Sequence, residues 1–184
     1  ENLSIALGSF GISPLDFAKF YSMFPNDGEV VEPTLIKHIE NSFGASMDYE
    51  PQKKQVLKPE QAFLMTTLLQ NVVNNGTGRN AKVNGIQIAG KTGTSNNSID
   101  AWFCGYSPDI EAIIWYGNDD NSPMKKVEGG SRTAAPVFKK FMEGYIKLYP
   151  TLRRAFEQPD GVYKGYYNGA DEYYTNDSPL PQNT

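Results

Sequence analysis

Hydrophobic residues recur at helical spacing in three stretches of the chain. The first begins with Ser13–Asp16, a helix start in which Ser13 can cap the free amides, and ends at the turn 25–28. The second runs from Pro59 to about residue 74, and the third from Pro136 to Tyr149. The residues expected to face the core are Phe17, Phe20, Tyr21 and Phe24 in the first helix, Ala62, Met65, Leu69, Val72 and Val73, with Leu64 and Leu68 beside them, in the second, and Val137, Phe138, Phe141, Met142 and Tyr145 in the third.

Strand patterns occupy the chain between the second and third helices. Residues 86–90 alternate in polarity, 101–106 are aromatic and nearly continuous, and 111–117 are rich in Ile, Trp and Tyr. The turn formers Ser107–Asp109 favour a hairpin between the last two strands. This order of elements predicts an α/β fold of the α+β type, an antiparallel β-sheet sandwiched by helices, rather than alternating βαβ units.

Other segments lack a clear period. Residues 34–39 are predicted to be a short extended segment, and 41–54 a polar surface loop. After Pro150 the pattern fails, and from Gly161 the chain is rich in Tyr, Gly, Asn and Asp. We therefore predict a body of residues 1–156 and a tail of residues 157–184 that is mobile, unless its tyrosines dock on a surface.

Charge and composition narrow the possible partners. The formal net charge is −4, and residues 157–184 account for it, so the remainder carries 16 acidic and 16 basic residues. A neutral body argues against nucleic acid or an anionic membrane surface as the main partner. Cys104 and His38 are the only residues of their types, which gives no disulfide framework and no Cys/His metal site. No cofactor or metal is expected.

Gly85–Thr92 fits the phosphate-binding loop pattern by its letters. Such a loop needs a strand before its first Gly and a helix that begins at its Lys-Thr pair. Here the middle residues alternate like a strand, and the pair is followed by the turn formers 93–98. The sequence therefore argues against nucleotide binding.

The better interpretation places Lys91-Thr92-Gly93-Thr94 at the end of a strand. Residues 92 and 94 then point to one face, where two hydroxyls can bind one carboxylate. Lys91 adds positive charge beside that carboxylate, and Gly93 leaves room for a ligand against the backbone. An edge strand also offers unpaired backbone groups to an extended peptide. Alone, such a short motif also fits an ordinary hairpin with a charged end.

Several further motifs give this stretch a context. In order along the chain they are Ala6–Ser9, Ser13–Asp16, Gly76–Gly78, Ala89–Ser95, Asp100–Tyr106 and Gly129–Gly130. In order and spacing they resemble the class A penicillin-binding proteins from about Leu3 to about Tyr149. The resemblance implies a penicillin-binding transpeptidase fold, like that of serine β-lactamases, with only the C-terminal part of that domain in residues 1–156.

The resemblance also implies roles for the strand residues. Lys91 and Thr94 would be catalytic, and Thr92, Gly93 and Thr94 would bind substrate, with the Thr94 amide in the oxyanion hole. The acylated Ser of the Ser-x-x-Lys motif, and the Ser-x-Asn motif, would lie in an upstream segment. Ser122–Lys125 and Ser95–Asn97 match these two motifs by letters but follow Lys91, so we reject both.

The function implied is that of a D,D-transpeptidase, which cross-links peptidoglycan stem peptides through an acyl-serine and is acylated by β-lactams. Two alternatives stay open: a hydrolase of the β-lactamase or D,D-carboxypeptidase type, and a non-catalytic scaffold. The expected partners are the upstream segment, stem peptides and β-lactams. The expected location is the bacterial cell envelope, on the periplasmic side of the inner membrane, with an anchor upstream.

Overall fold

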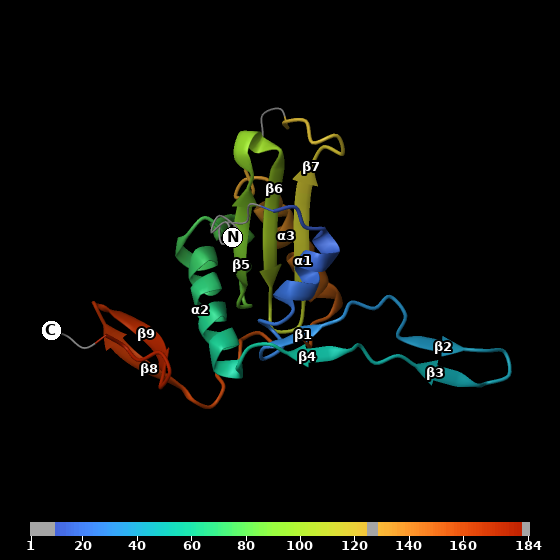
Figure 1. The fold of residues 1–184 in the computed structure, drawn as a ribbon, viewed down its shortest axis with the longest axis horizontal. Helices are drawn as coiled ribbons and strands as arrows, with labels where there is room; N and C mark the ends of the chain where they lie inside the picture. The colour runs from blue at the N-terminus through green and yellow to red at the C-terminus, as the bar shows by residue number, and fades with distance from the viewer. Residues whose placement is uncertain (1–9, 125–128, 182–184) are drawn as a thin grey trace.

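The computed structural model describes residues 10–124 and 129–181. At its centre lies an antiparallel sheet of three strands in the order β5-β6-β7, with the bounds Ala89–Thr94, Asp100–Tyr106 and Glu111–Gly117. Helix α3 (Ala134–Leu148) covers one face, and α1 (Pro14–Tyr21) lies on the other (Figure 1). Helix α2 (Pro59–Asn75) runs beside β5 (Figure 1). The predicted sheet between helices is confirmed.

Helix α3 closes one side of the sheet because two of its residues share a face at i and i+4. Phe138 and Met142 are fully buried, and the Phe138 ring lies 4.9 Å from that of Phe103 on β6. Val137 and Phe141 were expected in the core but are partly exposed. Helix α3 therefore buries a narrower stripe against the sheet than the sequence suggested.

Helix α1 closes part of the opposite face. The Ser13 hydroxyl accepts a hydrogen bond from the Asp16 amide at 3.1 Å, which confirms the predicted cap. Phe17 packs against Trp102 of the sheet. The prediction that Phe20 faces inward is wrong, because it lies about 100° around the helix from Tyr21 and is 51% exposed.

Helix α2 extends one residue beyond the predicted end. Its buried residues are Ala62, Thr66, Leu69 and Val73. Thr66 belongs in this stripe because its hydroxyl donates to the Ala62 carbonyl and meets the Tyr106 hydroxyl, each at 2.9 Å. Met65 and Leu68 were predicted to be buried but are exposed, so apolar character alone misplaced the stripe by one residue.

Strands β6 and β7 lie close to their predicted positions, but β5 begins three residues later than expected. Residues 86–88 precede the ladder, where the Gln87 amide donates to the Arg154 carbonyl at 2.8 Å. Two short 3₁₀ turns, η2 (Arg79–Ala81) and η3 (Asn96–Ser98), flank the strand in sequence. The displacement places the polar stretch 91–94 inside the sheet.

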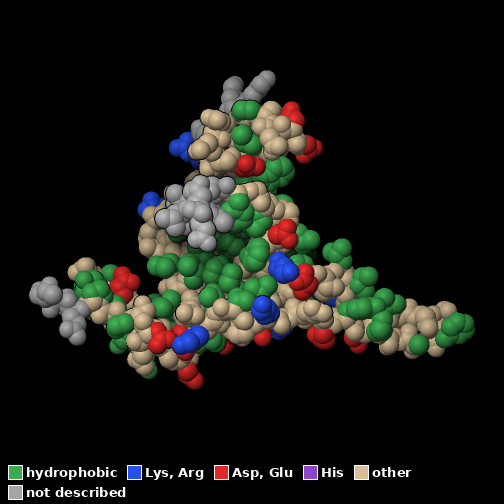
Figure 2. All heavy atoms as spheres, viewed as in Figure 1, with side chains coloured by type: hydrophobic (Ala, Val, Ile, Leu, Met, Phe, Trp, Pro, Cys, Tyr) green, Lys and Arg blue, Asp and Glu red, His purple; other side chains and the backbone are tan. Residues whose placement is uncertain are grey.

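A hairpin arm projects from the body between α1 and α2 (Figure 1). Strands β1 (Glu29–Val31) and β4 (Lys53–Gln55) form its base, and β2 (His38–Glu40) and β3 (Ser46–Asp48) form its outer part. The expected loop at 41–54 is therefore wrong in part, and the extended segment 34–39 is regular only from residue 38. Apolar side chains are exposed along this arm (Figure 2). His38 is exposed on this arm, with its Nδ1 2.7 Å from the Asp48 Oδ1.

The tail is more regular than expected. Strands β8 (Val162–Tyr167) and β9 (Ala170–Thr175) form a hairpin closed by Asn168 and Gly169, both with positive φ. The Tyr173 ring lies 5.4 Å from that of Phe63 on α2. The sequence pattern did not predict this hairpin, and at least one tyrosine docks on a helix. The mobility of the tail stays a prediction. The boundary between residues 156 and 157 stays a prediction.

Candidate active site

The open edge of β5 carries the residues that the sequence singled out. The Ser95 amide donates to the Asp100 carbonyl at 3.1 Å, in the register that sets Thr94 opposite Ala101. Bonded and non-bonded pairs alternate along an antiparallel ladder. The backbone groups of Thr92 and Thr94 therefore point away from β6, toward the open edge, as an oxyanion-binding amide and a peptide-binding strand require.

Lys91 leaves the strand on the face opposite the two threonines, since it stands across from Cys104 while Thr92 stands across from Phe103. Its Nζ returns to the open edge and donates to the Thr92 carbonyl at 2.9 Å. Across residues 10–124 and 129–181, no carboxylate forms an ion pair with this ammonium. A positive charge with no acidic partner among the described residues is thus held beside the edge.

The hydroxyls of Thr92 and Thr94 each form a hydrogen bond with a loop from another part of the chain. The Thr92 Oγ1 lies 2.7 Å from the Thr77 Oγ1, in the turn that follows α2. The Thr94 Oγ1 accepts a hydrogen bond from the Gly130 amide at 3.1 Å. The fold therefore brings three separate motifs of the sequence to one place.

The backbone of Gly129 and Gly130 passes very close to strands β5 and β6. Gly129 has φ +75°, and a Cβ there would stand 2.6 Å from the Thr94 Oγ1. A Cβ on Gly130 would stand 2.1 Å from the Trp102 carbonyl oxygen. Only glycine fits this approach, which explains the Gly-Gly pair beside the site.

A groove of about 800 Å³ opens next to the edge strand. Lys91–Ser95 line one side of it, and aromatic side chains of α1 and the sheet, among them Phe17, Trp102 and Trp115, line part of the remainder. The Trp115 Nε1 donates to Asp100 at 2.8 Å and so fixes the indole. Cys104 also lines the groove and is buried. The groove is mostly apolar, with polar groups along one wall.

The rejected motifs do not form sites of their own. Lys91 and Thr92 lie in a strand rather than at a helix start, so the phosphate-loop geometry is absent from Gly85–Thr92. Ser95–Asn97 belong to the tight turn before β6. The Ser122 hydroxyl accepts from Asn118 at 3.1 Å, and Lys125 lies outside the described residues.

Within the part of the chain that the structure describes, no group of three or more His, Cys, Asp or Glu could hold a metal ion, and no helix is long and apolar enough to cross a membrane.

Residues 1–143 match the family model described as the penicillin binding protein transpeptidase domain. The chain belongs to this family. It is 36% identical over 169 residues to penicillin-binding protein 1A/1B of Bacillus subtilis (strain 168), covering 84% of this chain and 18% of that protein. It is 37% identical over 180 residues to penicillin-binding protein 1A of Neisseria lactamica, with coverage of 94% and 22%. The chain thus spans about a fifth of the length of these relatives.

Solved structures confirm the predicted fold. Penicillin-binding protein 1A of Haemophilus influenzae is similar with a TM-score of 0.86 at 22% identity, over 98% of this chain and 34% of that chain. A D,D-transpeptidase domain from Eggerthella lenta gives 0.62 at 27% identity, over 76% and 33%. The PonA1 protein of Mycobacterium tuberculosis, solved in complex with penicillin V, gives 0.75 at 22% identity, over 98% and 47%.

The transpeptidase domain also holds a buried acid that the sequence analysis missed. Glu111 begins β7 opposite Tyr106, and its Oε1 has no hydrogen-bond partner among the described residues. Burial raises the pKa of this carboxyl to about 8. Burial also raises the pKa of Tyr21 and Cys104 nearby, and the Glu111 charge adds to each shift. No spacing rule marks such a residue, because its burial depends on how α1 docks.

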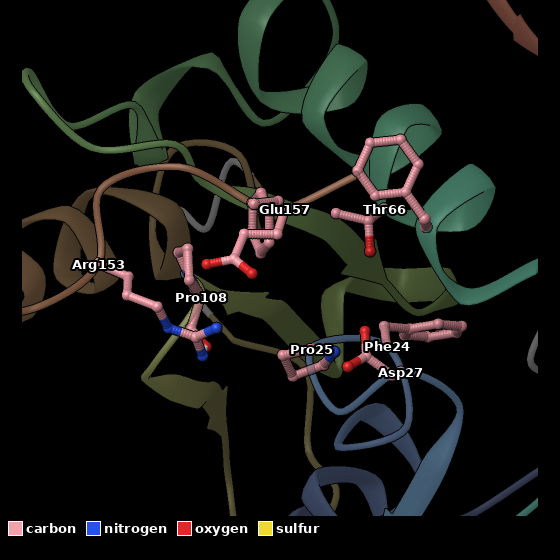
Figure 3. A pocket seen from close by; sticks show the side chains of 9 residues that line it. Phe24, Pro25, Asp27, Thr66, Pro108, Arg153 and Glu157 are labelled. Atoms are coloured by element: carbon pink, nitrogen blue, oxygen red, sulfur yellow. Dashed lines mark hydrogen bonds between the residues drawn. The ribbon is translucent and has the colours of Figure 1, made fainter. Parts of the chain in front are cut away.

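A second, smaller cavity of about 60 Å³ lies at the other end of the sheet (Figure 3). Its guanidinium, from Arg153, is already bound to Asp109 at 2.6 Å and to the Pro108 carbonyl at 2.7 Å. Its hydroxyl, from Thr66, is bound within the core. Both groups are engaged within the protein, and the cavity is far smaller than the groove beside β5, so the edge of β5 remains the candidate active site of this domain.

Proposed function

We propose that this chain is the C-terminal part of a peptidoglycan D,D-transpeptidase, and that β5 forms one wall of its acyl-transfer site. The observation that carries the proposal is the open edge of β5. There the Lys91 ammonium, the hydroxyls of Thr92 and Thr94 and the outward Thr94 amide come together. Family membership and the β-lactam complexes of similar structures support it.

In this proposal an upstream serine attacks the carbonyl between the two D-Ala residues of a stem peptide. The Thr94 amide donates to the oxyanion as negative charge develops on the carbonyl oxygen. The peptide bond then breaks, D-Ala leaves with a proton on its nitrogen, and an acyl-serine remains. An amine of a neighbouring strand next attacks the ester, forms the cross-link and frees the serine. No metal or cofactor enters these steps.

The β5 side chains recognise the substrate carboxylate. Two hydroxyls on one face of the strand can each donate to a carboxylate oxygen, and Lys91 adds attraction at the same edge. β-Lactams carry a carboxylate in a similar place and would acylate the same serine. The protein would act at the bacterial cell envelope, on the periplasmic side of the inner membrane, held by an upstream anchor.

A fluorescent penicillin tests this function on the full-length polypeptide that contains the chain. We expect covalent labelling, and peptide mapping should place the label on an upstream serine that is followed three residues later by lysine. Labelling at Ser122, or at any other serine of these 184 residues, would overturn the assignment of the site. Stem-peptide donors then separate a transpeptidase from a hydrolase, because only the former yields product joined to an added amine.

A further inference from the structure

The turn that follows α2 holds one hydroxyl in a fixed position. The amides of Gly76 and Gly78 both donate to the Val72 carbonyl, each at 3.0 Å. A Cβ on Gly76 would stand 2.9 Å from that oxygen, so the turn requires glycine there. Thr77, between the two glycines, is thereby pinned with its Oγ1 at 2.7 Å from the Thr92 Oγ1.

A second loop ties this turn to Thr94. The Ser131 hydroxyl donates to the Thr77 carbonyl at 2.7 Å, and the Asn80 side chain donates to the Ser131 carbonyl at 2.9 Å. The neighbouring Gly130 amide donates to the Thr94 Oγ1. The two strand hydroxyls are therefore supported by loops that are themselves hydrogen-bonded to each other.

The direction of these hydrogen bonds matters for an anion. A hydroxyl has one proton to donate and two lone pairs that accept. A backbone amide can only donate, so the Thr94 Oγ1 accepts from Gly130 and keeps its own proton for a ligand. For Thr92 and Thr77 either hydroxyl can be the donor. The Thr92 proton is free for a ligand only if Thr77 donates to it.

We propose that Thr77 is a positioning residue that donates to the Thr92 hydroxyl and so turns the Thr92 proton toward the substrate carboxylate. Thr77 then donates a hydrogen bond to the Thr92 Oγ1, as the Gly130 amide does to the Thr94 Oγ1. The site then holds two hydroxyls that each accept one hydrogen bond from the protein and keep a proton to donate, which favours an anion over a neutral group. This inference rests on the proposed function of β5, since it assumes that a carboxylate binds there.

The test compares a penicillin acid with its methyl ester on the full-length protein. Thr77→Val should lower the acylation rate by the acid about three- to tenfold, as expected for the loss of one hydrogen bond. Acylation by the ester should stay within about twofold of the wild type, because the ester has no anion to recognise. Thr77→Ser keeps the donor and should restore the rate with the acid. Thr77→Ala is a second variant without the hydroxyl, for use if the valine variant does not fold.

Two results would overturn the role of Thr77. One is an unchanged rate with the acid in both variants that lack the hydroxyl. The other is an equal loss with the acid and the ester, which would mark a purely structural effect. Failure of the proposed function looks different: the wild-type protein would then not be acylated by either probe.

Discussion

Replacing Lys91 with alanine should lower penicillin acylation of the full-length protein by a hundredfold or more, on the order of 3 kcal/mol. Its ammonium stands at the open edge of β5, and no carboxylate of the described residues neutralises it. The substitution removes positive charge beside both the substrate carboxylate and the expected serine. Thr92→Val and Thr94→Val should each cost about ten- to a hundredfold, since each removes one hydrogen bond to a charged group.

Controls separate this loss of rate from a loss of folding. Lys82→Ala removes an exposed lysine that does not line the groove, and it should leave acylation unchanged. Thermal unfolding of the strand variants should stay close to the wild type, because Lys91 is exposed and the threonines are at most partly buried. If acylation is unchanged in both threonine variants, or if all three proteins unfold, the stretch 91–94 has a structural role in a hairpin and no role in acylation.

The second large effect concerns Glu111 and pH. Its folded pKa of about 8 lies well above the usual value of a glutamate, so the folded state keeps a proton that the unfolded state loses. This contribution to stability is fully present below about pH 4.5 and is lost as the pH rises to about 8. Over that window we expect a decline of roughly 1.4 kcal/mol per pH unit from this one group.

Glu111→Gln should remove most of this decline. The variant should match the wild type near pH 5 and exceed its free energy of unfolding at pH 9 by on the order of 4 kcal/mol. Denaturant unfolding of both proteins at the two pH values measures the difference. Glu172→Gln changes an exposed carboxylate of β9 and should leave the profile as it is. If the free energy of unfolding of the wild type equals that of the variant at both pH 5 and pH 9, Glu111 is not buried as described.

Local patterns predicted the elements whose burial follows one simple period. Strands β6 and β7 and helices α2 and α3 lie within a few residues of the expected positions. Strand β5 begins and ends later than expected, since its pairing extends through Lys91–Thr94, where polar residues hide the alternation that marks a core strand. Asn168 and Gly169 are typical of a tight hairpin turn, but the tyrosine-rich composition around them obscured the strands, so the tail hairpin was not predicted.

The site itself was predictable only in part. The motif Lys91–Thr94 was found from its chemistry, and the resemblance added Gly76–Gly78 and Gly129–Gly130 without giving them a role. Contacts such as Thr77 with Thr92 join residues far apart in sequence, and no periodicity reports them. Glu111 was missed for the same reason: its neighbours are set by the docking of α1 on the sheet.

The most direct test of the central claim is a crystal structure of the full-length protein acylated by a penicillin. We predict that the penicillin carboxylate lies within about 3 Å of the hydroxyls of Thr92 and Thr94. The acyl carbonyl oxygen should accept from the Thr94 amide. A carboxylate bound away from β5, with the hydroxyls of both threonines unengaged by the ligand, would contradict the account.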